Sequence, residues 1–267
     1  MPLVRLVEFL FLSTPLEKIE DLLHELHDPI ETGGVSYDNP AEDLKPYLPA
    51  LREFEKLKTT DELSYIIYDE TWEPIDRMTA IDSRVGQLVV GQELEEINSL
   101  LCGPCHCSLC CIGPTNPLEQ HFFEIPLSAE EIDRFALPRI DTEGTRSATA
   151  SDDSSLIIEG RPFYEHPMAL YHWRTSWSLI LPRHSRCPNL DETGGCGIYP
   201  KRPDICRRPQ IFSYVLENLT GANENEYVKQ DKILAVWDCP YVRQLKNEIA
   251  AYAELSELEP IFKTNKA

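Results

Sequence analysis

Eight of the nine cysteines in this chain fall into two short blocks. The first cysteine block holds Cys102, Cys105, Cys107, Cys110 and Cys111, and the second holds Cys187, Cys196 and Cys206. The ninth, Cys239, follows alone. Thiols at this density are typical of a metal or iron–sulfur site. We therefore expect the fold to be organised around the cysteines.

The arrangement of the cysteines argues against a disulfide framework, because their number is odd and Cys110 and Cys111 are adjacent. The sequence has no run of 18 apolar residues, so no membrane span is predicted. The apolar stretch 3–12 carries Arg5 and Glu8 and lacks a small-residue cleavage site, which is unlike a signal peptide. These features predict a cytoplasmic protein with reduced thiols, where clustered cysteines serve metal or redox chemistry.

The formal net charge of −20 argues against nucleic-acid binding. Residues 1–100 carry 22 acidic and 8 basic side chains, whereas residues 183–208 carry six basic and three acidic ones. Positive neighbours lower the pKa of a thiol and offset the charge of thiolate ligands. We expect a redox or other protein partner, and neither nucleic acid nor a membrane.

Capping motifs and apolar spacing predict four helices. Capping boxes indicate helix starts at Thr14 and Ser128, and a further helix is expected from Pro240 onward. A helix over residues 92–101 should end at Gly103-Pro104. The first cysteine block would then begin in the loop after this helix.

The sequence predicts an α+β fold. Strands are expected over residues 63–68 and 176–181. We predict a loop-rich, helix-dominated metal-binding domain over residues 91–267, preceded by an acidic N-terminal region over residues 1–90.

The cysteine spacing predicts metal ligation. A Cys-x-x-Cys pair brings two sulfurs to one metal, and four thiolates complete a zinc site or an iron–sulfur cubane. One such site would leave five thiols over, and two would use eight. Cys239 at a helix start suits a distant ligand, because N–H groups there favour a thiolate. The predicted metal ligands are Cys105, Cys107, Cys110, Cys111, Cys187, Cys196, Cys206 and Cys239.

Two arginines of the second block, Arg202 and Arg207, are predicted to contact the bound cofactor by hydrogen bonds to sulfur and by their charge. An alternative for Arg202 is a purely structural contact with Asp204 or a backbone carbonyl. His166 and His172 lie in an aromatic-rich stretch that we expect to pack as core.

The motifs Cys107-x-x-Cys110-Cys111 and Cys196-x-Ile-Tyr-x-x-Arg-Pro-x-x-Cys206-Arg resemble the YkgJ-type cysteine-cluster family, described as a zinc- or iron-chelating domain. The similarity covers roughly residues 105–245. The family's first cysteine would fall at Pro104, and this chain has Cys102 and Cys105 instead. The first block is also similar to that of flagellin lysine N-methylases, which adds methyl transfer as a distant alternative.

Three functional interpretations follow. The first is an iron–sulfur protein, with a 4Fe-4S cluster favoured, that serves in electron transfer or within an oxidoreductase or modification enzyme. The second is a zinc-binding structural or partner-contact module, and the third is a metal chaperone. The sequence shows neither a phosphate-binding loop nor a Ser-His-Asp signature, so no catalytic residue is assigned.

Overall fold

The computed structural model describes residues 2–115, 120–150, 156–208, 210–219 and 225–264. It is a mixed α/β structure, 41% helical and 24% strand. The mixed class is confirmed, but the helix-dominated character that we predicted is wrong, because long strands after both cysteine blocks build two four-stranded sheets. Within the described ranges, no helix is long and apolar enough to cross a membrane.

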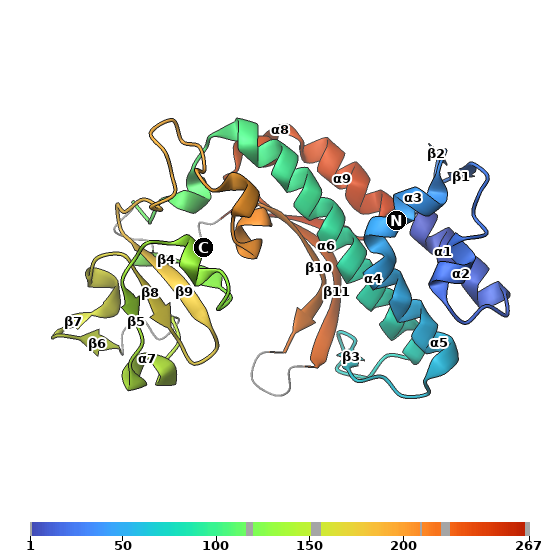
Figure 1. The fold of residues 1–267 in the computed structure, drawn as a ribbon, viewed down its shortest axis with the longest axis horizontal. Helices are drawn as coiled ribbons and strands as arrows, with labels where there is room; N and C mark the ends of the chain where they lie inside the picture. Colours follow the sequence, from blue (N-terminus) through green and yellow to red (C-terminus); the bar gives the residue numbers. More distant parts are fainter. Residues whose placement is uncertain (1, 116–119, 151–155, 209, 220–224, 265–267) are drawn as a thin grey trace. The chain divides into compact units, whose positions relative to one another are not determined.

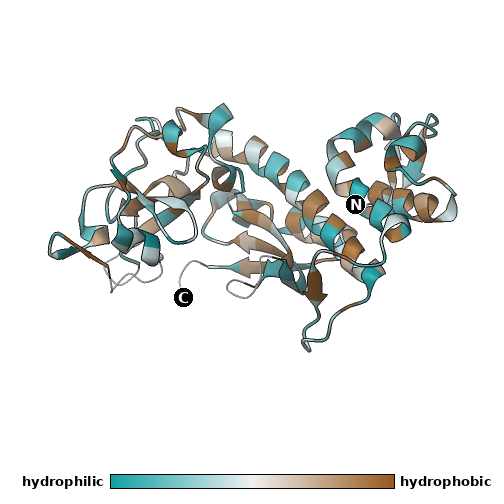
Figure 2. Ribbon diagram, turned by 60° about the horizontal axis from the view of Figure 1, so that its bottom comes forward, coloured by the Kyte–Doolittle hydropathy of each residue, from teal (hydrophilic) through white to brown (hydrophobic). Residues whose placement is uncertain are grey.

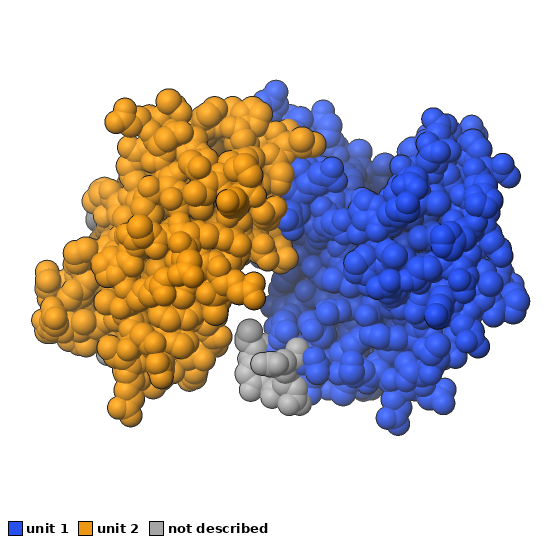
Figure 3. All heavy atoms as spheres, viewed as in Figure 1, with its two compact units in different colours: residues 1–97, 210–238, 242–264 blue, residues 98–209, 239–241, 265–267 orange. Residues whose placement is uncertain are grey.

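The chain divides into two compact units (Figure 3). Among the described residues, unit 1 is drawn from residues 2–97, 210–238 and 242–264, and unit 2 from residues 98–208 and 239–241. Each unit therefore contains segments that are far apart in sequence. The domain boundary near residue 90 stays a prediction.

The N-terminal part of unit 1 is a cluster of short helices around one apolar core. Its elements are α1 (Pro2–Ser13), α2 (Ile19–Leu23), β1 (Ile30–Thr32), β2 (Val35–Tyr37), α3 (Pro40–Leu44), α4 (Leu48–Leu51) and α5 (Lys56–Thr59). The helix start expected at Thr14 is wrong. Thr14 Oγ1 donates to the carbonyl of Phe11 at 3.1 Å, so this hydroxyl closes α1, and α2 begins later without a side-chain cap.

The sheet of unit 1 has the order β10-β11-β12, with β3 also paired to β11. The strands are β3 (Ile66–Tyr68), β10 (Ile211–Asn218), β11 (Glu226–Val236) and β12 (Glu259–Lys263). Figure 1 shows α6 running across β10 and β11, and Figure 2 shows apolar residues concentrated on these strands. At a bulge in β10, Gln87 Oε1 of α6 accepts the N–H groups of Val215 and Leu216 at 2.9 and 3.0 Å. The strand predicted at 63–68 is therefore present in shortened form, as β3.

Helix α6 (Arg77–Cys105) is longer than the helix predicted over residues 92–101. Gly103-Pro104 does not end it. Proline removes one helical N–H and crowds the preceding residue, but Gly103 has no side chain to clash, so the last turn forms. Cys102 and Cys105 consequently lie on a helix and not, as expected, in a loop. Helices α8 (Pro240–Gln244) and α9 (Lys246–Leu255) confirm the helical segment predicted from Pro240.

Unit 2 is built on a sheet with the order β4-β9-β8-β5. The strands are β4 (Phe122–Leu127), β5 (Arg139–Ile140), β8 (Ala169–His172) and β9 (Trp177–Pro182), and the smaller elements are α7 (Glu143–Ser147), β6 (Ile157–Ile158) and β7 (Arg161–Pro162). The strand predicted at 176–181 is confirmed as β9. The helix predicted from Ser128 is reduced to a single 3-10 turn, Ile132–Arg134.

Alternating side chains give this sheet two apolar faces. Leu170 and Leu179 contribute to one face, while Tyr171 and Ile180, their neighbours in sequence, contribute to the other. The second face is closed by aromatic rings, with Trp173 stacked on Tyr171 at 5.2 Å. The first face, which we call the thiol-side face, is the one against which cysteines pack.

Candidate metal centre

Six cysteines from the two blocks line one small cavity of about 60 Å³ in unit 2. The remaining walls come mainly from apolar side chains and from one arginine. We call this cavity the thiol pocket, and it is lined by Cys102, Cys110, Cys111, Ile125, Phe135, Cys187, Asn189, Cys196, Ile198, Tyr199, Arg202, Pro203 and Cys206.

Strand pairing brings the two cysteine blocks together. The first block ends shortly before β4, and β9 ends shortly before the second block. Because β4 and β9 are antiparallel, with Phe122 opposite Pro182, the chain enters β4 and leaves β9 at the same end of the sheet. The N–H of Cys187 then donates to the carbonyl of Cys111 at 2.8 Å. The thiol pocket is thus a product of the sheet topology.

The thiol-side face forms the floor of the pocket. Ile125 belongs to this face and also lines the cavity, and Cys187 and Cys206 pack against the same apolar cluster. Gly113 allows the close approach between the block and β9, since a Cβ there would lie 2.0 Å from the carbonyl oxygen of Pro182. A larger residue at position 113 would push the first block off the sheet.

The loop before Cys196 is fixed by an aspartate. Asp191 Oδ1 accepts the N–H groups of Thr193 and Gly195, each at 2.8 Å, and the hydroxyl of Thr193 at 2.7 Å. The Thr193 hydroxyl, followed by the backbone N–H groups, lowers the pKa of Asp191 against an opposing effect of desolvation. Gly194 adopts a φ of +86°, which favours glycine. The Asp-x-Thr-Gly-Gly run is a turn signal from which this arrangement can be predicted.

Glu131 anchors the last cysteine segment. Its side chain, in a residue 5% exposed, accepts the N–H of Asp204 at 2.8 Å and that of Ser128 at 2.9 Å, and it pairs with Arg134. Burial raises the pKa of Glu131, but these backbone N–H groups and the arginine outweigh it and lower the pKa. Of the predicted capping box, the hydrogen bond from the Ser128 N–H to the Glu131 carboxylate is present. The same carboxylate also holds the turn that contains Cys206, through the N–H of Asp204. Sequence reasoning did not find this role.

Arg202 is the charged side chain that lines the pocket. The residue is 4% exposed, its Nη2 donates to Ser99 Oγ at 2.5 Å, and its guanidinium lies 3.9 Å from the centre of the Tyr199 ring. Tyr199 in turn donates to the carbonyl of Ser99. Nε of Arg202 is buried and has no hydrogen-bond partner in the described part of the chain. A buried N–H donor lowers the stability of the fold unless an acceptor forms a hydrogen bond with it.

Arg207 lies differently from Arg202. Its guanidinium donates to the carbonyls of Arg202 and Pro200 at 3.4 and 3.2 Å, and it lies 3.9 Å from Asp204. It does not line the thiol pocket. The structure thus brings one of the two predicted arginines to the cysteines and uses the other to brace the loop, while their roles toward a cofactor stay predictions.

Three of the pocket thiols, Cys102, Cys110 and Cys206, have a raised pKa and keep their protons in the metal-free chain. Burial and nearby thiolates raise the pKa of Cys206 to about 12, against a smaller lowering by Arg202. A hydrogen bond from Cys102 lowers the pKa of Cys110, but its hydrogen bond to Cys111, burial and thiolate neighbours prevail and raise it to about 12. A hydrogen bond with Cys110 and burial raise the pKa of Cys102 further. Metal binding would therefore release protons.

The donor set of the pocket fits a thiolate-bound metal. Thiolates are soft ligands. Burial raises the pKa of Cys187, but the backbone N–H groups of Asn189 and Leu190 at its sulfur offset part of this effect and favour the thiolate. The open Nε of Arg202 offers a further donor to sulfur. Among the described residues, no three His, Cys, Asp or Glu side chains yet converge as ligands of a single ion. Ligation would replace the thiol protons and reorient these side chains.

The other three cysteines form a separate group, which we call the outer thiols: Cys105, Cys107 and Cys239. Cys107 is hydrogen-bonded to both Cys105 and Cys239. Cys239 is completely buried. The hydrogen bond from Cys239 lowers the pKa of Cys107 to about 5, against the effect of burial, with help from the N–H of Leu109. The predicted distant ligand Cys239 thus lies beside Cys107 and not in the pocket lining.

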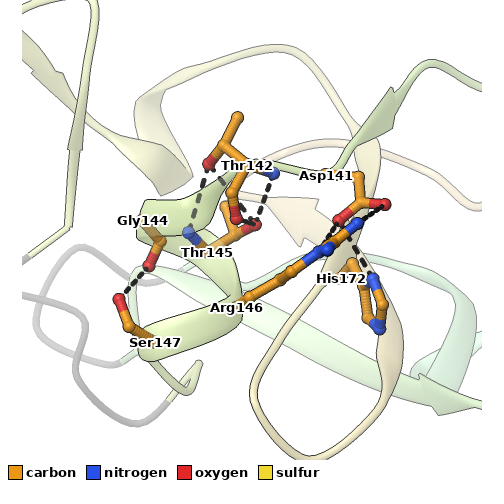
Figure 4. A network of polar contacts seen from close by, with 7 residues as sticks. All are labelled: Asp141, Thr142, Gly144, Thr145, Arg146, Ser147 and His172. Carbon is orange, nitrogen blue, oxygen red and sulfur yellow. Dashed lines mark hydrogen bonds and ion pairs between the residues drawn. The ribbon is translucent and has the colours of Figure 1, made fainter.

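The two histidines are partly exposed and not buried in the core as predicted, although each makes local contacts. His172 stacks on Trp177 at 4.5 Å, and its Nδ1 lies 3.0 Å from Asp141 Oδ1. Figure 4 shows Arg146 reaching the same carboxylate, and this hydrogen bond, more than His172, lowers the pKa of Asp141 to about 2. His166 Nε2 contacts the carbonyl of Ile158 at 2.8 Å. These polar groups are satisfied within the fold.

Fold and pocket together define a cysteine-rich domain in which a small sheet supports a cluster of thiols. A family model, CxxCxxCC, described as "Putative zinc- or iron-chelating domain", matches residues 101–233, about half of the chain. This segment therefore belongs to that family, as its cysteine motifs predicted. The family description links it to chelation of zinc or iron. No curated protein and no solved structure matches the chain.

Proposed function

We propose that the thiol pocket holds a polynuclear metal centre, an iron–sulfur cluster with 4Fe-4S favoured, and that the chain exchanges single electrons with a protein partner. The observation that carries this proposal is the set of six cysteines around one cavity with a buried arginine. A mononuclear zinc site and a 4Fe-4S cubane each take four thiolates, so the count of six does not separate them, and the size and charge of the pocket support the cluster.

The size of the cavity supports more than one metal atom. Four sulfurs in contact with one zinc at about 2.3 Å leave no void between them. A volume of about 60 Å³ exceeds the roughly 10–15 Å³ that one water requires. The space suits a group of several metal and sulfide atoms better than one ion.

The electrostatics support a negatively charged centre. Thiolates on ferric and ferrous iron leave net negative charge, and the potential of such a cluster depends on hydrogen bonds to its sulfurs and on its burial. Arg202 supplies a buried positive charge with one open donor at the pocket. Its electrostatic effect already lowers the pKa values of Cys102 and Cys206 relative to burial alone.

A second candidate is a pair of zinc ions that share the six thiolates, as in Zn₂Cys₆ modules. The same count of six cysteines favours it, and it would make the domain a structural or partner-contact module. A metal chaperone would instead hold its metal in fractional, exchangeable amounts.

The test is the content of iron, acid-labile sulfide and zinc in the full chain purified without oxygen, together with its visible spectrum. Iron with equimolar sulfide and a broad visible absorbance is expected. Two zinc ions without sulfide would overturn the cluster in favour of the second candidate. In Cys206→Ser the pocket metal should be lost, whereas Ile205→Ser, an exposed neighbour that gains the same side chain, should retain it.

A further inference from the structure

In unit 1, β3 and the segment after it form a small hairpin, residues 66–76, which we call the Trp72 hairpin. Its two arms are joined by an antiparallel bridge between Tyr68 and Pro74. Trp72 lies in the turn and is 64% exposed, and its ring centre lies 6.3 Å from that of Tyr68. Tryptophan and tyrosine are enriched at protein interfaces, because they provide a large contact area with few rotatable bonds.

Hydrogen bonds within the turn fix the position of Trp72. Asp69 Oδ1 accepts the N–H groups of Thr71 and Glu73 at 2.8 and 3.0 Å, and the carbonyl of Asp69 accepts the N–H of Trp72 at 3.1 Å. These contacts hold Trp72 at a φ of +65°, a left-handed conformation that is unfavourable for a bulky residue. The ring is thus presented to solvent by an ordered turn, which reduces the conformational entropy that binding would cost.

The charge around the exposed ring is negative and locally unbalanced. Residues 61–76 contain six carboxylates and no Lys, Arg or His. Glu70 and Glu73 are exposed and form no ion pair with another residue of the described ranges. The next basic residue, Arg77, donates to the carbonyls of Leu57 and Thr60, so its charge is engaged at the end of α5. The hairpin therefore combines an aromatic surface with carboxylates that lack a counter-charge.

We propose that the Trp72 hairpin is a docking site for a basic segment of a protein partner, in which an arginine stacks on Trp72 and pairs with Glu70 or Glu73. The tryptophan face attracts cations more strongly than other aromatic rings. A guanidinium is planar, stacks on such a ring and can pair with a carboxylate at the same time.

The strand beside the ring extends this surface with apolar area. Ile66 is 44% exposed and lies on the same side of β3 as Tyr68, because alternate residues of a strand share a face. An extended segment could therefore cover apolar side chains next to the arginine, which a small free cation would leave open. The site contains no cysteine, so this inference goes beyond the proposed function and does not depend on it.

The experiment titrates a short blocked peptide, in which arginine alternates with alanine, into the isotope-labelled full-length chain. The matched probe is the same peptide with citrulline, which keeps the shape of the side chain without its charge. The indole N–H resonance of Trp72, assigned by its absence in Trp72→Ala, should shift with the arginine peptide only. By calorimetry, Trp72→Ala should bind this peptide roughly 5–30-fold more weakly than the wild type, and Trp72→Phe should lose less.

A charge control separates the hairpin from the overall acidity of the chain. Glu70→Gln combined with Glu73→Gln should weaken binding of the arginine peptide. Glu17→Gln combined with Glu25→Gln removes the same charge from exposed positions of the helical part of unit 1 and should leave the affinity nearly unchanged. Equal losses in the two double variants would overturn the site, because general attraction to an acidic protein would then explain the binding.

Three further results would overturn the proposal. They are equal affinity of the arginine peptide for wild type and a folded Trp72→Ala, equal binding of the citrulline peptide, and the absence of any shift of the Trp72 resonance. A shift of the same size with spermine would replace the protein segment by a small polyamine. Circular dichroism establishes that each variant is folded, which we expect because the substituted side chains are exposed.

Discussion

Replacement of Arg202 by methionine separates two roles of this side chain, its contribution to the stability of the metal-free fold and its proposed role as a counter-charge to thiolate ligands. Methionine keeps much of the length of the side chain and removes its charge and all its donors. The hydrogen bond to Ser99 and the stacking on Tyr199 are lost. The buried Nε, which has no partner within the described residues, is removed as well.

The expected cost differs between the metal-free and the metal-bound chain. A hydrogen bond from a charged group contributes about 1.5–3 kcal/mol and a desolvated cation–π contact about 2 kcal/mol. Burying the guanidinium opposes both by several kcal/mol. The free energy of unfolding of the metal-free chain should therefore change by less than about 2 kcal/mol. With thiolates present, a charge at about 5 Å and an effective dielectric constant of about 20 contributes about 3 kcal/mol, so metal affinity should fall roughly 100-fold.

Urea unfolding of the metal-free chain and competition with a chelator for zinc measure the two quantities. Lys201→Met is the matched control, because it removes the same charge from an exposed neighbour. An Arg202→Met variant with unchanged metal affinity would refute the role of Arg202 as the counter-charge. Equal losses of metal affinity in Arg202→Met and Lys201→Met would also refute it, because the overall positive charge of the loop would then explain the effect without a specific contact.

Further predictions concern the fold around the site and its pH dependence. Gly113→Ala should destabilise unit 2 by several kcal/mol, because the new Cβ would lie 2.0 Å from the carbonyl oxygen of Pro182; an unchanged urea midpoint would contradict this. Tyr241→Phe removes the 2.7 Å hydrogen bond from the buried tyrosine to Asn98 Oδ1, and it should lower the free energy of unfolding in urea by about 1–3 kcal/mol. A loss below about 0.5 kcal/mol, the size that is typical of surface substitutions, would contradict this. Burial raises the pKa of Tyr171 to about 12, so its contribution to stability is complete below pH 10 and is lost as the pH rises through 12. The stability difference between wild type and Tyr171→Phe should therefore narrow from pH 10 to 12, and a constant difference would refute it.

The cysteine motif and its family were the part of this molecule that the sequence predicted best. A Cys-x-x-Cys motif is recognised from the local spacing of its residues alone, and the family model confirms the motif. Five of the eight predicted ligands line the thiol pocket, and the sixth cysteine there, Cys102, was not among the predicted ones. Their division into pocket and outer thiols was not predictable, because it depends on Cys239, whose position relative to Cys107 is set by tertiary packing.

The secondary structure around the site was predicted less well. Gly103-Pro104 is a strong helix-stop signal, yet α6 continues to Cys105. Proline in the last turn removes only one backbone hydrogen bond of the helix. The Ser128 capping box forms only in part, since the carboxylate of Glu131 also accepts the N–H of Asp204. In both cases the position within the folded chain outweighs the local preference of the residues for a helix start or stop. Sequence spacing contains no information on that position.

The topology also determines what a bound metal contributes to the domain. In a zinc finger the ligands meet only when the metal is present, so metal binding and folding are one event. Here the pairing of β4 with β9 places the ends of both blocks together, and the bond from Cys187 to Cys111 joins them without any ion. The apolar thiol-side face then supports the sulfurs from below. Because folding of the sheet alone already brings these cysteines together, the free energy of the proposed ligation would appear mainly as metal affinity and less as folding stability.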